Sequence, residues 1–113
     1  MSDCLFCKIA AGEIPADIVL ETDDILAFRD IDPQAPTHVL VIPRQHFDNV
    51  SDLTRDDKDL AARVLSATAE VAQLETLERG YRVVTNVGSD GGQSVRHVHF
   101  HVLGGRGLTW PPG

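Results

Sequence analysis

Apolar and polar positions alternate along several short segments of this chain, which is the pattern of strands that bury one face. We predict strands at residues 18–21, 25–29, 38–43, 81–86 and 95–103. The first two strands are separated by Thr22, Asp23 and Asp24, whose side chains are typical of a hairpin turn.

Two segments instead have the spacing of helices. Residues 5–11 predict a short helix that ends at Gly12. A longer helix is expected to begin at Thr54 as its cap and to run to about Leu77, before Gly80. Its apolar stripe would pack on the sheet and consists of Leu60, Val64, Leu65, Thr68, Val71 and Ala72. Together these elements predict an α+β fold, a five-stranded antiparallel sheet with one short and one long helix, in a single domain over residues 1–113.

Composition excludes some classes of partner. The 113-residue chain has a net charge of −7, so no basic excess is present to displace counterions, and we expect no binding to polymeric nucleic acid. The apolar run at residues 39–42 is far shorter than a membrane span, and the N-terminal segment lacks the composition of a signal peptide. We therefore expect a cytoplasmic protein that does not bind membranes.

Three histidines alternate with apolar residues near the C-terminus, in the order His97-Val98-His99-Phe100-His101-Val102-Leu103. Alternate side chains of an extended strand share one face. The three imidazoles would therefore lie on one face and the apolar side chains on the other. The chain has five histidines in all, so this concentration favours a functional site over a strand whose outer face carries histidine by chance.

A glycine-rich segment, residues 88–94, comes shortly before the triad. Closely spaced glycines let backbone N–H groups surround an anion, and Ser94 adds a hydroxyl. Two chemistries fit the triad itself: chelation of a catalytic metal by neutral imidazoles, or attack of one imidazole on phosphorus with its neighbours stabilising charge. The glycine-rich segment favours the second, because its donors suit an anion rather than a cation.

The triad resembles the signature of the histidine triad (HIT) superfamily. Residues 30–38, 88–94, 104–106 and 110–113 resemble its histidine triad nucleotide-binding branch, and the resemblance extends over nearly the whole chain. It implies a HIT-like fold whose sheet continues across a homodimer. It also implies a purine nucleoside phosphoramidase, which cleaves the P–N bond of adenosine 5′-phosphoramidates through a nucleotidyl-histidine intermediate and releases AMP and an amine.

The resemblance also implies roles for individual residues. His99 would be the nucleophile, and the other members of the catalytic set would be His38, Ser94 and His101. Asp30 would bind the ribose hydroxyls. The residues expected around the base are Phe6, Ile9, Phe28 and Ile31. Those expected around the phosphate are Asn86, Gly92, Gln93 and Val95. Trp110 lies in a tail that reaches toward the partner's site in the family.

The residue types leave simpler interpretations open. Asp30 precedes a proline-rich segment and can equally begin a turn. The apolar side chains assigned to the base slot are more often core residues. Ser94 and Asn86 can cap a loop, and His38 can be a buried histidine whose hydrogen bonds are satisfied.

Cys4 and Cys7 predict a second site. A redox pair would need a preceding strand, but only three residues come before Cys4. Tetrahedral structural zinc needs two more ligands, and we predict that these are His46 and His97. Related bacterial histidine triad proteins and galactose-1-phosphate uridylyltransferases use a comparable arrangement. The alternative is a pair of reduced thiols without a metal.

Two other functions compete with the phosphoramidase. One is hydrolysis of dinucleoside polyphosphates, as in a sister branch, although the ending at residues 110–113 favours the nucleotide-binding branch. The other is a purine nucleotide-binding or scaffolding protein whose hydrolase activity is incidental. A binding site for AMP and a site for its phosphoramidate would use the same residues, so the sequence leaves this alternative open.

Overall fold

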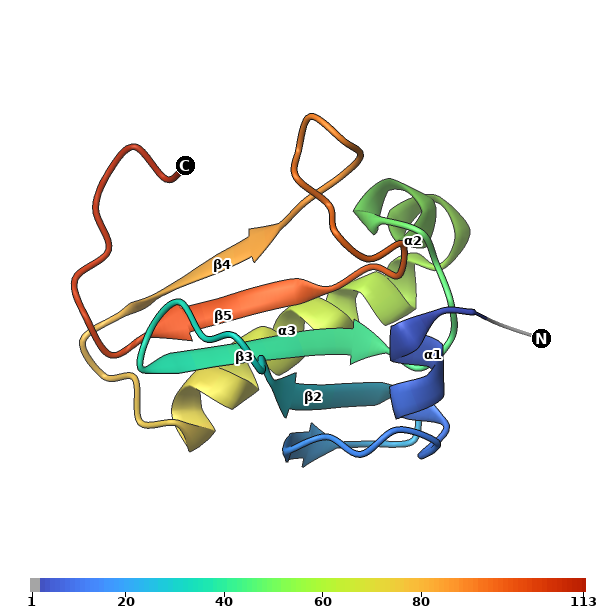
Figure 1. The fold of residues 1–113 in the computed structure, drawn as a ribbon, viewed down its shortest axis with the longest axis horizontal. Helices are drawn as coiled ribbons and strands as arrows, with labels where there is room; N and C mark the ends of the chain where they lie inside the picture. Colours follow the sequence, from blue (N-terminus) through green and yellow to red (C-terminus); the bar gives the residue numbers. More distant parts are fainter. Residues whose placement is uncertain (1–2) are drawn as a thin grey trace.

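The computed structural model describes residues 3–113 and confirms the α+β fold with a five-stranded antiparallel sheet (Figure 1). The strands lie in the order β1-β2-β3-β5-β4. They are β1 (Ile18–Glu21), β2 (Ile25–Arg29), β3 (Thr37–Pro43), β4 (Tyr81–Thr85) and β5 (Phe100–Gly104). The helices are α1 (Leu5–Ala10), α2 (Val50–Asp56) and α3 (Lys58–Leu74).

Helix α3 covers one face of the sheet. Its buried side chains recur at helical spacing and include Leu60, Val64 and Val71, which pack against β-branched residues of the central strands such as Val41 and Val102. The predicted stripe is wrong at Leu65, which is exposed. Ala67 is buried in addition to the predicted positions.

Helix α1 packs on the opposite face, beside β2 and β3 (Figure 1). There Phe6 contacts a second, smaller cluster that consists of Leu26, Phe28, Leu40 and Ile42. Strand β3 is buried along its whole length, because its alternate side chains enter the two clusters in turn. The α1 face therefore combines a small core with the functional residues described below.

The last strand begins at Phe100, five residues later than predicted. The preceding segment makes its hydrogen bonds elsewhere. The backbone N–H of Val98 donates to the carbonyl of Phe47, and Nε2 of His97 lies 2.8 Å from the carbonyl oxygen of Pro43. His97 and His99 therefore lie in a connection that packs on the β3–α2 loop, and only His101 is within the strand.

The predicted long helix is two helices, and Thr54 is not its cap. Asp57 has φ −154° and ψ 83°, which ends α2, and its side chain accepts a hydrogen bond from the N–H of Leu60 and caps α3. Thr54 lies inside α2, where its hydroxyl donates to the carbonyl of Ser51. An aspartate cap directly after the last residue of α2 thus allows the chain to turn between the two helices.

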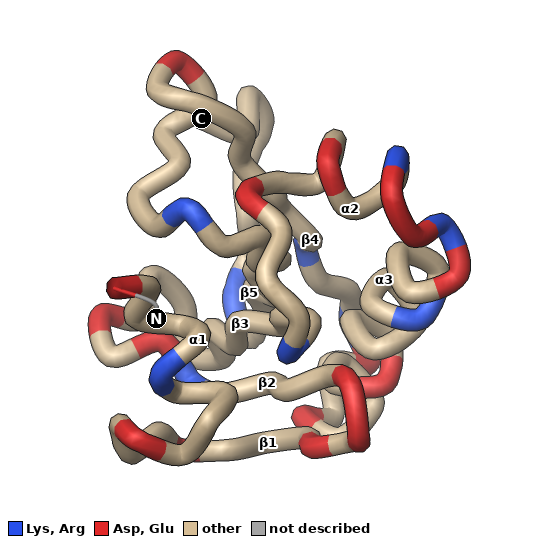
Figure 2. Tube along the Cα trace, turned by 90° about the vertical axis from the view of Figure 1, so that its right-hand side faces the viewer, with Lys and Arg blue, Asp and Glu red and all other residues tan. Residues whose placement is uncertain are grey.

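Lys and Arg positions alternate with Asp and Glu positions around α2 and α3 (Figure 2). Across residues 3–113, no helix combines the length and the apolar character needed to cross a membrane.

Candidate functional site

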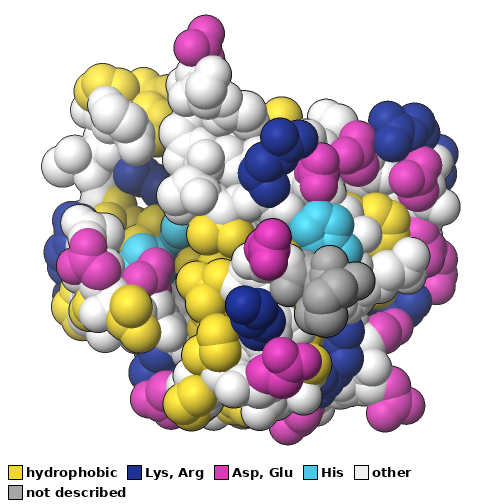
Figure 3. Space-filling model, turned by 45° about the vertical axis from the view of Figure 1, so that its right-hand side comes forward, with side chains coloured by type: hydrophobic (Ala, Val, Ile, Leu, Met, Phe, Trp, Pro, Cys, Tyr) yellow, Lys and Arg dark blue, Asp and Glu magenta, His cyan; other side chains and the backbone are white. Residues whose placement is uncertain are grey.

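A cavity of about 540 Å³ opens on the α1 face of the sheet. The apolar residues of its wall include Phe6, Ile9, Phe28, Ile31 and Leu40. The polar ones include Asp30, Ser94, His99 and His101. In Figure 3, histidine side chains reach the surface in two places, and apolar side chains lie between them. The structure therefore brings residues from both ends of the chain to one hollow.

Phe6 and Phe28 belong to the core and to the cavity wall at the same time. Both are about 5 % exposed or less, and their ring centroids lie 5.4 Å apart in an edge-to-face arrangement. Phe6 also meets the imidazole of His99 edge to face at 5.1 Å. Ile9 is half-buried, whereas Ile31 is fully exposed at the cavity. The cavity thus has a buried aromatic floor and an exposed apolar residue at its rim.

The imidazole of His99 is held by its neighbour in the triad. Its Nδ1 lies 2.8 Å from the carbonyl oxygen of His97. A carbonyl only accepts hydrogen bonds, so Nδ1 carries the proton and Nε2 of the neutral ring carries the lone pair. His99 lines the cavity. This tautomer is the one that a nitrogen nucleophile requires.

His38 and His101 form a relay with the backbone of Gln34. The N–H of Gln34 donates to Nδ1 of His38 at 3.0 Å, so Nε2 of His38 carries that ring's proton. Nε2 of His38 lies 2.8 Å from Nδ1 of His101 and donates to it. Nε2 of His101 therefore carries a proton. His38 is buried with both nitrogens satisfied and does not line the cavity, whereas His101 does.

Burial keeps both relay histidines neutral. Burial, together with smaller contributions from the neighbouring His99 and His38, lowers the pKa of His101 to about 4. Burial also lowers the pKa of His38, although the nearby Asp30 opposes this effect. At neutral pH the relay therefore supplies an N–H donor and no positive charge.

Asp30 begins a turn and also lines the cavity. Its Oδ1 accepts a hydrogen bond from the N–H of Asp32 at 2.9 Å, as in an Asx turn. Its Oδ2 lies 3.5 Å from Nε2 of His38. The turn interpretation is thus right for the local structure, and the same turn places the carboxylate at the cavity wall.

Residues 88–95, which we call the glycine loop, fold back on themselves. The N–H of Gly92 donates to the carbonyl of Ser89, and the N–H of Gln93 donates to the carbonyl of Gly88. Gly92 has a φ of +77°, and a Cβ at Gly91 would collide with the carbonyl of Val87. Both positions therefore require glycine.

The end of the glycine loop lines the cavity and has N–H groups that are not used inside the loop. Ser94 and Val95 line it, and within residues 3–113 their N–H groups donate to no protein group. The N–H groups of Gly92 and Gln93 are used inside the loop. The predicted substrate-binding residues that do not line the cavity are Asn86, Gly92, Gln93 and Trp110. The spacing of residues in the sequence did not show which N–H groups of the glycine loop are bonded inside the loop and which remain available to a ligand.

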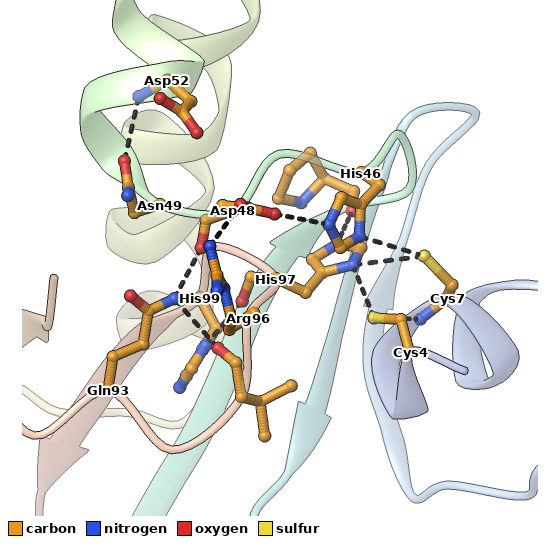
Figure 4. A network of polar contacts seen from close by, with 12 residues as sticks. Cys4, Cys7, His46, Asp48, Asn49, Asp52, Gln93, Arg96, His97 and His99 are labelled. Atoms are coloured by element: carbon orange, nitrogen blue, oxygen red, sulfur yellow. Dashed lines mark hydrogen bonds and ion pairs between the residues drawn. The ribbon is translucent and has the colours of Figure 1, made fainter. Parts of the chain in front are cut away.

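The predicted zinc ligands come together as a group that could hold a metal ion, which we call the metal centre and which consists of Cys4, Cys7, His46 and His97 (Figure 4). Their donor atoms all lie within 4.8 Å of one another. Nδ1 of His97 lies 3.4 Å from Sγ of Cys4 and 3.5 Å from Sγ of Cys7, and Nδ1 of His46 lies 3.3 Å from Sγ of Cys7. Ligands of a tetrahedral zinc are about 3.3–3.8 Å apart, so this donor set fits the ion.

The outer nitrogens of both imidazoles support the same conclusion. Nε2 of His97 donates to the carbonyl of Pro43 at 2.8 Å, and Nε2 of His46 donates to Oδ1 of Asp48 at 2.9 Å. Both Nδ1 atoms are therefore unprotonated and face the sulfurs, as metal-bound histidines require.

The three triad histidines do not converge on one ion. His97 belongs to the metal centre, His99 is held by a backbone carbonyl, and His101 is bonded to His38. Asp30, His38 and His101 also lie within 4.8 Å of one another. However, the two imidazole nitrogens are only 2.8 Å apart, closer than two ligands of one zinc ion, which are about 3.3 Å apart. This second group is therefore a hydrogen-bonded relay.

Comparison with known proteins places these residues in a family context. The model of the HIT domain family matches residues 11–108. A HIT-like protein of Synechococcus elongatus is 51% identical, and the match covers 98% of this chain and 97% of the relative. A 14 kDa zinc-binding protein of Zea mays is 47% identical, with 99% of this chain and 89% of the relative covered.

Two solved structures show the same fold. A HIT family hydrolase from Legionella pneumophila is 58% identical with a TM-score of 0.94, and the match covers 98% of this chain and 100% of that one. A histidine triad nucleotide-binding protein from Candida albicans is 34% identical with a TM-score of 0.83, and the match covers 96% of this chain and 83% of that one.

Proposed function

This chain belongs to the HIT domain family, and we propose that it is a purine nucleoside phosphoramidase that hydrolyses the P–N bond of adenosine 5′-phosphoramidates. The similar proteins include a HIT family hydrolase and a histidine triad nucleotide-binding protein. The observation that carries the proposal is the tautomer of His99. Its Nδ1–H is bonded to the carbonyl of His97, so its Nε2 lone pair is available in a cavity that also holds anion donors.

The reaction has two steps. In the first, Nε2 of His99 attacks phosphorus and the P–N bond breaks, so the nucleotide is joined to the imidazole and the amine departs. The leaving amine takes a proton from the hydroxyl of Ser94 or from Nε2 of His101. In the second step water attacks phosphorus, the N–P bond to His99 breaks, and the water's proton returns to the donor. AMP and the free amine are the products.

The cavity matches the parts of such a substrate. The N–H groups of Ser94 and Val95 and the Nε2–H of His101 would donate to the non-bridging phosphate oxygens, where negative charge develops in the transition state. The apolar wall at Phe6 and Phe28 would take the base, and the carboxylate of Asp30 would accept from the ribose hydroxyls.

We propose that zinc binds at the metal centre and has a structural role. The name of the maize relative and the geometry of the four donors support this proposal. When bound there, zinc would cross-link the N-terminal helix to the β3–α2 loop and to the first residue of the triad. None of the four donors lines the cavity, so we assign the metal no part in the chemical step.

We also propose a homodimer in which two β4 edges join the sheets. Strand β4 is an outer strand of the sheet, and such an edge leaves backbone groups available for pairing. Tyr81 and Val83 on this strand are exposed. Val83 pairs with Val102, so it lies on the face that α3 covers further inward. A second copy would cover these side chains and complete the hydrogen bonding of the edge.

Steady-state hydrolysis by purified protein tests the function. The panel contains adenosine 5′-phosphoramidates, diadenosine polyphosphates and nucleotide sugars. We expect the phosphoramidates to have the highest kcat/KM. Preference for a diadenosine polyphosphate would contradict the proposal in favour of the sister activity. Tight AMP binding without turnover of any substrate would indicate a nucleotide-binding protein and not an enzyme.

A further inference from the structure

Asp48 links the metal centre to the glycine loop. It lies in the connection between β3 and α2, two residues after His46. Its Oδ1 accepts a hydrogen bond from Nε2 of His46, and its Oδ2 accepts one from Arg96, both at 2.9 Å. Its backbone oxygen accepts a third from the side-chain amide of Gln93. In Figure 4 these contacts meet at Asp48, with His46 on one side and Gln93 on the other.

Gln93 closes the glycine loop and attaches it to Asp48. Its Oε1 accepts from the N–H of Gly88 at 3.0 Å, and its Nε2 donates to the carbonyl of Val95 at 2.9 Å as well as to Asp48. Ser94 and Val95, which line the cavity, follow directly in the chain. The position of the Asp48 backbone therefore affects where these two donors lie.

The other end of the connection is a metal ligand on the surface. The side chain of His46 is 39% exposed, and its Nδ1 lies 3.3 Å from Sγ of Cys7. Without a metal, this exposed imidazole is held by its weak contacts to Cys7 and His97 and by its hydrogen bond to Asp48. A metal–ligand bond at Nδ1 confines it to one orientation more strongly. Metal occupancy would thus restrict the side chain to which Asp48 is bonded.

We propose that Asp48 is a positioning residue that couples metal occupancy to phosphate affinity, so that a loaded metal centre holds the glycine loop in its anion-binding form. This inference rests on the proposed function, because it takes the glycine loop as the phosphate site. Thermodynamic reciprocity then requires that a bound nucleoside monophosphate raise the affinity for zinc by the same factor by which zinc raises the affinity for the monophosphate.

The branches of this connection differ in strength. Arg96 has a side chain that is 82% exposed, so its ion pair with Asp48 is screened by water and contributes little. The contact of Gln93 is to the Asp48 backbone, so it persists in any side-chain variant. Asp48→Ala therefore removes the bond to His46 while leaving the loop attached. Asp48→Asn keeps an oxygen that accepts from His46.

The experiment compares AMP with adenosine in zinc-loaded protein by isothermal titration calorimetry, with the zinc content of each sample verified. Adenosine occupies the base and ribose sites without reaching the glycine loop. We expect Asp48→Ala to weaken AMP binding about 5-fold or more, the lower end of typical coupling, and to leave adenosine binding unchanged. Asp48→Asn should stay within about 2-fold of wild type for AMP. Asp59→Asn removes the same charge from an exposed site on α3 and should change neither affinity.

A second measurement reads the coupling from the metal side. Competition for zinc with a chromogenic chelator should show that AMP tightens zinc binding by wild type about 5-fold. Adenosine should not, and the effect of AMP should be lost in Asp48→Ala. Equal loss of AMP and adenosine binding in Asp48→Ala would indicate general damage and overturn the inference, as would unchanged AMP binding. Wild type that binds neither ligand would instead overturn the proposed function.

Discussion

Nδ1 of His99 and the backbone oxygen of His97 are joined by a hydrogen bond of 2.8 Å. His97 thereby has two contacts of different kinds, because its imidazole belongs to the metal centre while its carbonyl sets the tautomer of the next histidine in the triad. The candidate nucleophile is consequently oriented by the main chain of a candidate zinc ligand.

His99→Ala should reduce turnover of an adenosine phosphoramidate by several orders of magnitude, because the stepwise path needs the nitrogen nucleophile. His101→Ala should cost about 10²- to 10³-fold, as expected for loss of one donor to developing charge. Rapid quench of wild type with a slow substrate should trap a nucleotidylated peptide that contains His99. AMP binding by His99→Ala serves as the control for folding. A label on another residue would disprove this assignment.

Purified protein should contain about one zinc per chain by elemental analysis. Cys7→Ser should lower the free energy of unfolding by about 2 kcal/mol or more, equivalent to a Tm lower by roughly 8 °C, because the metal centre ties the N-terminal segment to the rest of the fold. The kcat of the residual folded protein should change much less. Wild-type protein that is prepared without chelators and contains no zinc would contradict the structural zinc. A Cys7→Ser protein that keeps its fold but has no turnover would indicate a metalloenzyme.

His101 should titrate near pH 4 in the folded protein, which its imidazole C–H resonance in NMR can follow. An ordinary histidine in the unfolded chain titrates near pH 6.5. Between these pH values the His101 imidazole is protonated in the unfolded chain but neutral in the folded one. The contribution of His101 to the free energy of unfolding is therefore complete above pH 6.5 and is lost as the pH falls toward 4. Urea unfolding should therefore show that His101→Gln loses its stability deficit relative to wild type on going from pH 7.5 to pH 5. A constant difference would refute this pKa shift.

The C-terminal tail should govern the choice of amine. Arg82 donates to the carbonyl of Thr109 at 2.8 Å, which holds the tail beside β4, and the adjacent Trp110 is exposed. Deletion of residues 108–113 should change the relative kcat/KM across a series of amine leaving groups much more than it changes Tm. Arg82→Ala should shift the series in the same direction. Identical relative kcat/KM values before and after the deletion would show that the tail does not select the amine leaving group.

Val83→Lys should convert the protein into a monomer, because a charge on the β4 edge opposes burial of that strand against a second copy. Light scattering coupled to size exclusion should then give the 12.3 kDa mass of one chain, against twice that mass for wild type. Ile18→Lys is the matched control, since Ile18 is an exposed apolar residue on β1 at the opposite edge of the sheet. A wild-type monomer, or a dimer that Val83→Lys leaves intact, would contradict the proposed arrangement.

Short-range patterns determined most of the fold. The predicted bounds of β1 and β2 agree with the structure, as does the short first helix to within one residue, because alternation and helical spacing depend only on near neighbours. Residue chemistry was also sufficient to predict the metal centre, because two cysteines and two histidines together have few other roles. The structure places their donor atoms together.

The tertiary structure decided how the triad is divided. His97 bonds to a carbonyl 54 residues away, and His101 bonds to a histidine 63 residues away. These contacts draw His97 and His99 out of the strand that their alternation predicts and set the tautomers of His38 and His101. The side-chain period shows which residues share a face, but hydrogen-bond partners that are distant in sequence meet only when the sheet is assembled. For that reason the sequence by itself identified the imidazoles of the site and predicted a metal role for His97 and a nucleophilic role for His99. Only the folded chain shows the contacts that separate the three rings, with His97 beside the two cysteines, His99 on a backbone carbonyl and His101 on His38.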